Sequence, residues 1–404
     1  MATGDVSGDA HASNLAIELR RRGCEVVGVG GARLESAVGG PGQMLADNSG
    51  MSSIGLLEAL PLVAPTLVQQ ARVKRSLRAR PPDACVLVDY PGANLPLGSW
   101  LRRHAGESPL PIIYYIPPNE WLWNRGRTPG LLRLCDAVLC AYSGEQSYYA
   151  SEASALGMDT DKVAWVGHPV LDELHRAGFS SDASAKLAAR REVLGEVPAE
   201  GVAVIALCPG SRAQELRLIL PPLCRVAAKV SLALEGRGLS VRFVLPLPRA
   251  VSGLRASLVD PPLEAAGLAG RATVWEGDSR AALCSADLAL AKSGTVNLEL
   301  ALLRVPHLAC YRVSPLSARV GRAVGMQPRF ISLVNVILDD AVVPEFVQEG
   351  MDDEDAMADA ALGLLDHPGG ILDGFARLAA HVGAPGAASR AADAVLAALA
   401  QRPP

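Results

Sequence analysis

Residues 286–315 read ADLALAKSGTVNLELALLRVPHLACYRVSP, and this stretch decides the fold of the chain. An apolar run at 288–291 precedes a Ser-Gly-Thr turn, an apolar pattern of helical spacing begins near Leu298, and a second apolar run covers 307–311. This order predicts a strand, a turn, a helix and another strand. Parallel sheets are built from such units, so we expect an α/β fold.

The turn at Ser293, Gly294 and Thr295 has the residues of an anion-binding site. Glycine lets a ligand approach the backbone, hydroxyl groups supply hydrogen bonds, and the start of a helix attracts negative charge. Phosphate is the expected ligand. For this turn alone an ordinary capped helix is the better explanation, because short motifs often match by chance.

A second turn of the same kind follows the apolar run at 202–207 and contains Gly210, Ser211 and Arg212. Two such turns in one half of the chain favour a nucleotide. The planar cation of Arg212 can hold a diphosphate, and Glu299 can accept hydrogen bonds from ribose hydroxyls. The alternatives are a surface ion pair for Arg212 and a solvated helix face for Glu299; taken together, the turns favour the nucleotide site.

Composition limits the protein class. The chain has 404 residues, enough for two domains, and its net charge of −4 gives no overall case for nucleic-acid binding. The hydrophobic share is 50%, yet no apolar run reaches the roughly 18–20 residues that cross a membrane, so we expect a soluble or membrane-surface protein. The eight cysteines lack CxxC spacing and indicate reduced core residues, and the seven histidines lack metal-ligand spacing, so we expect metal-independent chemistry.

The first half of the chain opens with a glycine-rich turn over residues 1–9, followed by a helical pattern. A doubly wound domain needs a strand before that turn, but only three residues precede Gly4. Either the chain begins late or this half lacks its central strand, and we expect the former because a gap within a sheet leaves backbone groups unpaired.

Asp89 directly follows the apolar run at 84–88. A carboxylate at the carboxyl end of a parallel strand lies where open α/β sheets bind ligands. An Asp that caps the next helix is an equally good explanation from sequence.

Residues 51–70 are apolar but contain two prolines, which is too broken for a simple core helix. A basic cluster follows at Arg72, Lys74, Arg75, Arg78 and Arg80. This combination suits an anionic lipid surface. A core helix with a solvated end is equally consistent with it.

The strands expected from apolar runs divide between two domains. We expect an N-terminal domain over 1–177, a linker over 178–200, a nucleotide-binding domain over 201–385 and a terminal helix over 386–404 that crosses back to the first domain. The expected strands lie at 26–29, 84–88, 112–116, 137–140 and 163–166, then at 202–207, 241–245, 272–275, 288–291 and 307–311.

Short motifs occur along nearly the whole chain, each weak singly but specific in this order. They are Gly4-Asp5-Val6-Ser7-Gly8-Asp9, Ser53-Ile54-Gly55-Leu56-Leu57-Glu58, Asp89-Tyr90-Pro91 with Asn94, Trp121-Leu122-Trp123, Val166-Gly167-His168-Pro169, Pro209-Gly210-Ser211-Arg212 with Glu215, Ser293-Gly294-Thr295 with Glu299, Tyr311-Arg312-Val313-Ser314-Pro315, Ser332-Leu333-Val334-Asn335 and Val343-Pro344-Glu345. With them the chain resembles the lipid-A-disaccharide synthase family.

The resemblance implies two facing Rossmann-like domains, the GT-B glycosyltransferase arrangement, with a cleft between them. It implies transfer of 2,3-diacylglucosamine from its UDP ester to 2,3-diacylglucosamine 1-phosphate, with inversion, release of UDP and no metal or cofactor. The implied catalytic carboxylate is Asp89, and the implied diphosphate-binding residues include Arg212 and Asn335. The implied acceptor loop is Asp5, Ser7, Gly8 and Asp9; the implied acyl and membrane contacts are Ile54, Leu56, Leu57, Arg72, Lys74 and Arg75.

The implied partners are the UDP-sugar, a lipid monosaccharide 1-phosphate and a membrane surface, with a homodimer left open and no nucleic acid. The implied location is the cytoplasmic face of a bacterial inner membrane, or an organelle in an alga or plant. Another UDP-hexosamine enzyme, such as an epimerase, and a non-catalytic UDP-sugar-binding relative stay open.

The chain departs from the family pattern in three places. Asp5 replaces a glutamate, and Asn124 replaces an arginine that Arg127 can substitute. Gly92 stands where the family often has a second aspartate, so we expect Asp89 to work without a neighbouring carboxylate.

Overall fold

The structure is a computed structural model, and it describes residues 1–4, 6–47, 60–104, 110–122, 124–323, 325 and 327–400, with the backbone alone at 60–63, 120 and 121. Asp5, Ile54, Leu56 and Leu57, which the sequence singled out, lie outside the described residues. The chain divides into two compact units. Unit 1 comprises Met1–Asp172, Ala323–Gln327 and His381–Pro404, and unit 2 comprises Glu173–Arg322 and Pro328–Ala380.

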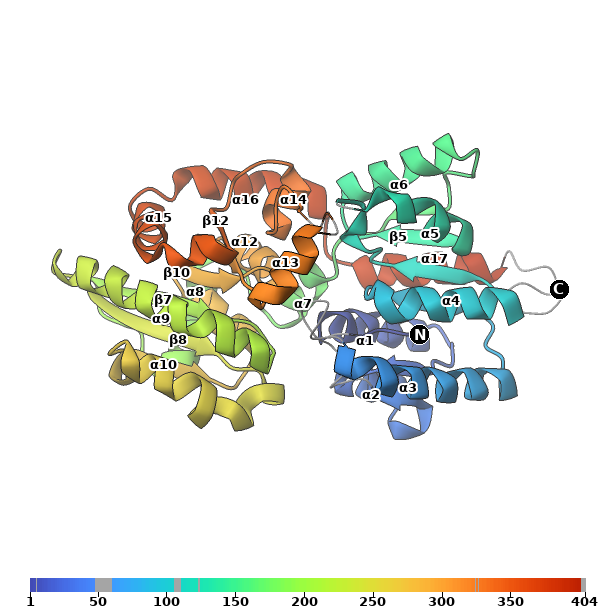
Figure 1. The fold of residues 1–404 in the computed structure, drawn as a ribbon, viewed down its shortest axis with the longest axis horizontal. Coiled ribbons are helices and arrows are strands. Elements are labelled where there is room, and N and C mark those ends of the chain that lie inside the picture. Colours follow the sequence, from blue (N-terminus) through green and yellow to red (C-terminus); the bar gives the residue numbers. More distant parts are fainter. Residues whose placement is uncertain are drawn as a thin grey trace. The chain divides into compact units, whose positions relative to one another are not determined.

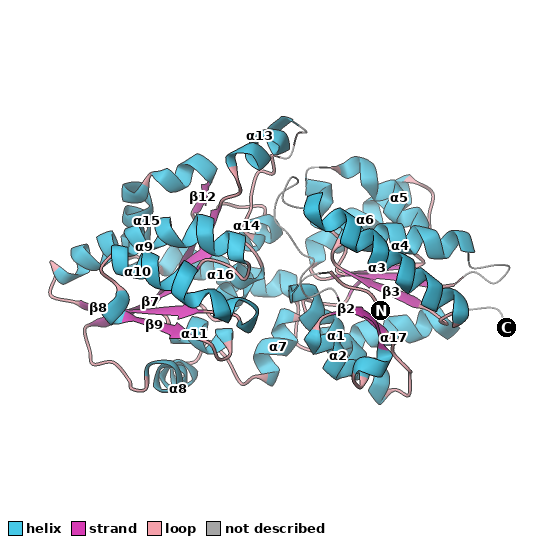
Figure 2. Cartoon of the chain, turned by 60° about the horizontal axis from the view of Figure 1, so that its bottom comes forward, coloured by secondary structure: helices cyan, strands magenta, loops and turns pink. Residues whose placement is uncertain are grey.

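Unit 2 is a parallel sheet with helices on both faces (Figures 1 and 2). Its elements in chain order are α8 (Ala183–Leu194), β7 (Val202–Cys208), α9 (Ala213–Glu235), β8 (Ser240–Pro246), α10 (Asp260–Ala265), β9 (Ala272–Trp275), α11 (Ser279–Ser285), β10 (Leu288–Lys292), α12 (Thr295–Leu302), β11 (His307–Tyr311), α13 (Pro315–Ala323), α14 (Leu333–Leu338), β12 (Glu345–Val347), α15 (Glu354–Asp366) and α16 (Gly369–Val382). The strand order is β12-β11-β10-β7-β8-β9.

The core of unit 2 explains why its central strands are largely apolar. Alternate side chains of a strand point to opposite faces, and both faces of this sheet are covered, so most positions of β7, β10 and β11 are buried. Ile205 and Leu207 of β7 and Leu288 and Leu290 of β10 pack with α9 and α15 on one face. Helices α8 and α11 cover the other face (Figure 2).

The order of these strands creates a switch point in unit 2. From β7 the chain adds β8 and β9 on one side of the sheet and then returns to add β10 on the other side of β7. Ala291 of β10 is level with Cys208 of β7, so the turns that follow these two strands lie next to each other. Open α/β sheets bind ligands outside the carboxyl ends of strands at such points.

Unit 1 repeats this architecture with shorter strands. Its elements in chain order are α1 (Val6–Arg21), β1 (Gly28–Gly30), α2 (Ala32–Val38), β2 (Met44–Asp47), α3 (Leu60–Ala79), β3 (Cys85–Val88), α4 (Pro91–His104), β4 (Ile112–Tyr115), α5 (Thr128–Leu134), β5 (Ala137–Cys140), α6 (Ser143–Ala155), β6 (Val163–Trp165), α7 (Val170–Arg176), which continues into unit 2, and α17 (Ala387–Ala400).

Residues 1–3 occupy the centre of the unit 1 sheet, where the sequence suggested that a strand was missing. Ala2 forms parallel bridges with both Val29 and Leu87. Its N–H donates to the carbonyl of Val86 (2.9 Å), and its carbonyl accepts the N–H of Val88 (2.8 Å). Three residues therefore pair the two halves of the sheet, and no unpaired gap remains. The switch point of unit 1 lies between residues 1–3 and β3.

All ten expected strands are present within a few residues of their predicted bounds, whereas β2 and β12 were not predicted.

The polar segment expected as a linker contains α8. Lys186 and Arg190 of this helix both pair with Asp287 (2.6 Å each). The boundary between the units falls at Asp172. The terminal helix α17 packs on α1.

Two predictions from composition were also tested. All eight cysteines are free thiols, and all but Cys24 are buried, as expected for reduced core residues. In the part of the chain that the structure describes, no helix combines the length and apolarity that crossing a membrane requires.

Candidate active site

Asp89 lies at the switch point of unit 1 in a conformation that non-glycine residues rarely adopt. The backbone φ is +49° at Asp89 and +36° at Tyr90. Asn94, which is buried, donates through its side-chain nitrogen to the carbonyls of Val88 and Asp89 (both 2.9 Å). The Tyr114 hydroxyl also donates to the Asp89 carbonyl (2.7 Å). Left-handed backbone persists only where its surroundings hold it, and such residues concentrate at functional sites.

The opening segment completes this turn. The Asn94 side chain donates to the carbonyl of Ala2 as well (3.3 Å), which ties the Asp89 turn to the central strand. A side-chain carbon at Gly4 would lie 1.9 Å from the Tyr90 ring, so only glycine leaves room for that ring. The Asp89 side chain is half-buried, and its Oδ1 accepts the Tyr90 N–H (2.8 Å). The fold therefore fixes this carboxylate at the ligand-binding edge of the sheet.

Unit 1 also contains a buried carboxyl group, Glu145. It lies in the first turn of α6, is 1% exposed, and accepts the Ala141 N–H (2.8 Å). Burial raises the pKa of Glu145 well above its ordinary value; the Ala141 N–H lowers it, and the negative charge of Asp89 raises it further. The expectation that Asp89 works without a neighbouring carboxylate stays a prediction.

The predicted acceptor loop has a different shape from the one expected. Helix α1 begins at Val6, so Ser7, Gly8 and Asp9 form its first turn rather than a loop. The buried Asp9 carboxylate accepts the N–H groups of Gly31 (2.6 Å) and Arg33 (3.0 Å), at the start of α2. Asp9 thus holds two helices together, and its carboxylate is engaged by the protein itself.

In unit 2, the turn after β7 is closed by an internal carboxylate. Glu215, whose side chain is 2% exposed, accepts the N–H groups of Ser211 (2.5 Å) and Arg212 (3.0 Å). Its Oε1 also pairs with the Arg212 guanidinium and with the Lys292 ammonium (3.1 Å each). The two N–H groups expected to bind phosphate are therefore already bonded, and the positive side chains around Glu215 are the groups this turn offers to an anion.

Local conformation explains this arrangement. Gly210 has φ +120°, and a side-chain carbon there would lie 2.1 Å from the Glu215 carboxylate. Only glycine therefore lets Glu215 fold back onto the turn. Burial alone would raise the pKa of Glu215, but Lys292 and Arg212 outweigh it and hold this pKa below its ordinary value, so the group is a carboxylate near neutral pH.

The turn after β10 lies beside the first one and opens α12. The Ser293 hydroxyl donates to the Ile331 carbonyl (2.5 Å), so it fixes the chain that precedes α14. The Gly294 N–H donates to the Asn297 side chain (3.2 Å). The N–H groups of Thr295 and Val296 belong to the first helical turn, where a helix offers no acceptor of its own. These groups and the helix dipole remain suited to an anion.

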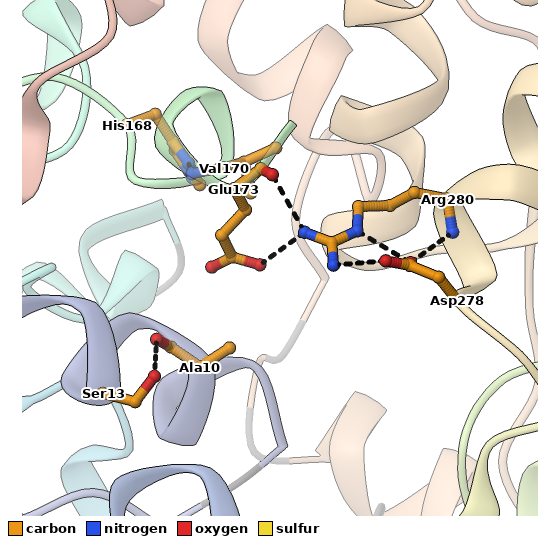
Figure 3. Close-up of polar contacts among 7 residues, drawn as sticks. All are labelled: Ala10, Ser13, His168, Val170, Glu173, Asp278 and Arg280. Carbon is orange, nitrogen blue, oxygen red and sulfur yellow. Dashed lines mark hydrogen bonds and ion pairs between the residues drawn. The ribbon is translucent and has the colours of Figure 1, made fainter. Parts of the chain in front are cut away.

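Glu299 lies on α12 and interacts electrostatically with Arg280, which belongs to a half-buried ion-pair cluster that follows β9. Arg280 pairs with both carboxylate oxygens of Asp278 (2.8 and 2.6 Å) and donates to the Glu173 carbonyl (3.0 Å), as Figure 3 shows. Burial lowers the pKa of Arg280, but the Asp278 hydrogen bond and carboxylate, then Glu173 and Glu299, raise it above its ordinary value. Glu299 is half-buried at the same edge of the sheet as the two turns.

Asn335 is buried, and the protein uses its whole amide. The side-chain nitrogen donates to the Val343 carbonyl and the Glu345 carboxylate (2.8 Å each). The side-chain oxygen accepts the N–H groups of Val342 (3.0 Å) and Val343 (2.8 Å). These contacts fix the chain beside α14, and a nucleotide contact of Asn335 stays a prediction.

Three of the predicted acyl and membrane residues, Arg72, Lys74 and Arg75, lie on α3. Arg72 and Arg75 are exposed, and Lys74 is half-buried with its ammonium 5.8 Å from the Trp100 ring. On the same helix Leu67 is 64% exposed, so a large apolar side chain precedes the basic cluster in the sequence.

Among the described residues, no three His, Cys, Asp or Glu side chains are grouped in a way that could hold a metal ion. Each unit holds a candidate site of its own. Unit 1 has the Asp89 carboxylate, and unit 2 has a cationic double turn, in which Arg212 and Lys292 pair with Glu215 beside the Ser293 turn.

A model of the family described as lipid-A-disaccharide synthetase matches residues 1–368. The chain belongs to this family. It is 39% identical over 411 residues to a lipid-A-disaccharide synthase of Prochlorococcus marinus, covering 98% of this chain and 97% of that protein. It is 36% identical over 409 residues to one of Gloeothece citriformis, covering 98% of each. Membership in this family confirms the resemblance that the motifs indicated, and it favours neither an epimerase nor a non-catalytic relative.

Solved structures show the fold. The UDP-GlcNAc 2-epimerase of Neisseria meningitidis has a TM-score of 0.61 at 14% identity, with 98% of this chain and 99% of that chain covered. MurG of Acinetobacter baumannii has a TM-score of 0.51 at 16% identity, with 98% of each chain covered. These similarities confirm the predicted α/β fold of the GT-B type.

Proposed function

We propose that this chain transfers 2,3-diacylglucosamine from its UDP ester to the 6-hydroxyl of 2,3-diacylglucosamine 1-phosphate, with inversion at the anomeric carbon. The observation that carries the proposal is the clamped left-handed turn at Asp89, which fixes a carboxylate at the switch point of unit 1. The family match over most of the chain supports the choice of substrates.

Asp89 acts in this reaction as the general base. As the acceptor oxygen forms its bond to the anomeric carbon, its proton moves to the Asp89 carboxylate. The bond from the anomeric carbon to the diphosphate oxygen breaks, and UDP leaves with that electron pair. Burial raises the pKa of Glu145 well above its ordinary value, which favours its protonated form, so Asp89 is the carboxylate to which we assign the role of base.

The cationic double turn of unit 2 binds the UDP group. Arg212 supplies a fixed positive charge to the diphosphate, and the start of α12 at Thr295 supplies N–H groups and the positive end of the helix dipole. Glu299 is placed to accept hydrogen bonds from ribose hydroxyls. These groups stabilise the charge that develops on departing UDP, and the proposed chemistry requires no metal.

Helix α3 is the proposed attachment to a membrane surface. Exposed Leu67 and Val68 would enter the acyl region while Arg72 and Arg75 meet anionic headgroups. Both sugar substrates carry acyl chains, so the enzyme must work where such lipids lie.

The direct test is a product assay. The protein is incubated with UDP-2,3-diacylglucosamine and 2,3-diacylglucosamine 1-phosphate, and the products are identified by mass spectrometry. We expect disaccharide 1-phosphate and UDP in equal amounts, and no product from unacylated UDP-GlcNAc. Absence of the disaccharide, or conversion of UDP-GlcNAc to its 2-epimer, would refute the proposal.

A further inference from the structure

We propose that the ammonium group of Lys292 contacts the diphosphate of the UDP-sugar together with Arg212. This inference rests on the proposed function and adds a residue that the sequence motifs did not single out. Lys292 ends β10 immediately before the Ser293 turn, and its side chain is 15% exposed. It is therefore held by the protein and still reaches the surface of the switch point.

Glu215 brings the two cations together. Arg212 comes from the turn after β7 and Lys292 from the end of β10, yet both bond the same oxygen, Oε1 of Glu215, at 3.1 Å. The other oxygen of Glu215 accepts the N–H groups of Ser211 and Arg212. One buried carboxylate thus fixes the positions of two positive groups that belong to adjacent strands.

The space beside Lys292 is open because residue 294 is glycine. A side-chain carbon at Gly294 would lie 3.6 Å from the Lys292 nitrogen, in ordinary contact with it. That space adjoins Thr295, the first residue of α12. The centre of the Tyr311 ring lies 5.7 Å from the same nitrogen. The ammonium, the glycine turn and the start of the helix therefore converge on one place.

Charge also favours a ligand there. Glu215 carries one negative charge against the two positive charges of Arg212 and Lys292, so the cluster is net positive. A sugar nucleotide carries two negative charges on its diphosphate, and UDP gains more as it leaves. An ammonium has three N–H donors, and Glu215 accepts from one of them, which leaves Lys292 able to donate to a phosphate oxygen.

The test is titration calorimetry of the full chain with UDP and with uridine, in buffer of constant ionic strength. Lys292→Met should weaken UDP binding about tenfold to a hundredfold, the range for a lost charge-assisted hydrogen bond, and leave uridine binding unchanged. Lys186→Met is the matched control, because Lys186 pairs with Asp287 at the opposite end of the same strand (2.6 Å). It should leave UDP binding unchanged.

Measurements in the Glu215→Gln variant distinguish a contact of Lys292 with phosphate from a role in neutralising Glu215 alone. If Lys292 only neutralises that carboxylate, removing it from Glu215→Gln should not alter UDP affinity. We expect the Glu215→Gln, Lys292→Met double variant to bind UDP at least tenfold more weakly than Glu215→Gln alone. This comparison leaves no buried unpaired carboxylate, so it also serves if Lys292→Met alone fails to fold.

The outcomes keep the two proposals apart. Unchanged UDP affinity on loss of Lys292 in the Glu215→Gln background overturns this inference, while UDP binding by the unaltered protein continues to support the proposed function. Failure of the unaltered protein to bind UDP at all refutes the proposed function, and this inference with it.

Discussion

Replacing Asn94 with alanine tests whether the clamp at the unit 1 switch point matters to turnover. Asn94 is 2% exposed and donates to the carbonyls of Val88, Asp89 and Ala2. After the change, Asp89 keeps the Tyr114 hydroxyl, and Ala2 keeps the N–H of Val88. The Val88 carbonyl loses this donor inside the protein.

One buried carbonyl left without this donor costs about 1–3 kcal/mol, and the vacated space costs about 1 kcal/mol more. At roughly 2–4 °C per kcal/mol for a unit of this size, the melting transition of unit 1 should fall by about 5–15 °C. Left-handed backbone at Asp89 costs about 1–3 kcal/mol, so without the clamp the turn relaxes, and turnover of the folded protein should drop about tenfold or more.

Calorimetry and an initial-rate assay well below the transition measure the two effects. Asp136→Ala is the matched control. The Asp136 carboxylate accepts the N–H of Ile112, the first residue of β4, at 2.7 Å, so this contact lies at the opposite end of the strands from Asp89. It should lower stability without lowering turnover. If Asn94→Ala loses stability but keeps full turnover, the clamp does not position the carboxylate and our reasoning fails.

Three further predictions address other parts of the account. Between the ordinary and the raised pKa of Glu145, the folded protein holds a proton that the unfolded chain has released, so stability falls as pH rises through that window, by at most about 1.4 kcal/mol per pH unit. Glu145→Gln should therefore lose less melting temperature between pH 5 and pH 8 than the unaltered protein; an equal loss contradicts the assignment. Gly210→Ala should destabilise the protein by about 2–4 kcal/mol and weaken UDP binding, since the new methyl displaces Glu215; an unchanged melting curve would show that the turn tolerates it. Reversing the charges of Arg72 and Arg75 to glutamate should weaken sedimentation with anionic vesicles about tenfold or more, whereas neutral vesicles should show little change; equal binding to anionic vesicles would exclude α3 as the contact.

The fold could be predicted largely from sequence because its strands are buried on both faces and appear as continuous apolar runs. The two strands that escaped prediction are edge strands. Residues of β2 (Met-Leu-Ala-Asp) and of β12 (Glu-Phe-Val) are half-buried or exposed, and their apolar runs of three and two residues are too short to predict a strand. The central strand of unit 1 escaped for a different reason: three residues are too few to show any periodicity.

The candidate site was predictable in its turns but not in its contacts. Ser211 and Arg212 suggested free N–H groups, yet Glu215 three residues further along bonds both, and a glutamate at that spacing from a helix start is a known capping signal. The electrostatic effect of Asp89 on Glu145 could not be found this way, because the two residues are far apart in sequence and follow different strands, β3 and β5.

The sequence contains only a weak indication of Lys292: it is a charged residue that ends an otherwise apolar strand just before a glycine turn. What spacing does not show is that its ammonium shares an oxygen with Arg212. That shared contact depends on which strands lie side by side, so it can be identified only from the three-dimensional structure.

The measurement that tests the central claim most directly is the turnover number of Asp89→Asn, determined beside its affinity for UDP. Asparagine keeps the shape and can still accept the Tyr90 N–H, but it cannot take a proton. We predict that turnover falls about 100-fold or more, in the range for loss of a general base, while UDP binding, which we assign to unit 2, stays within about twofold. Turnover equal to that of the unaltered protein would show that Asp89 is not the base.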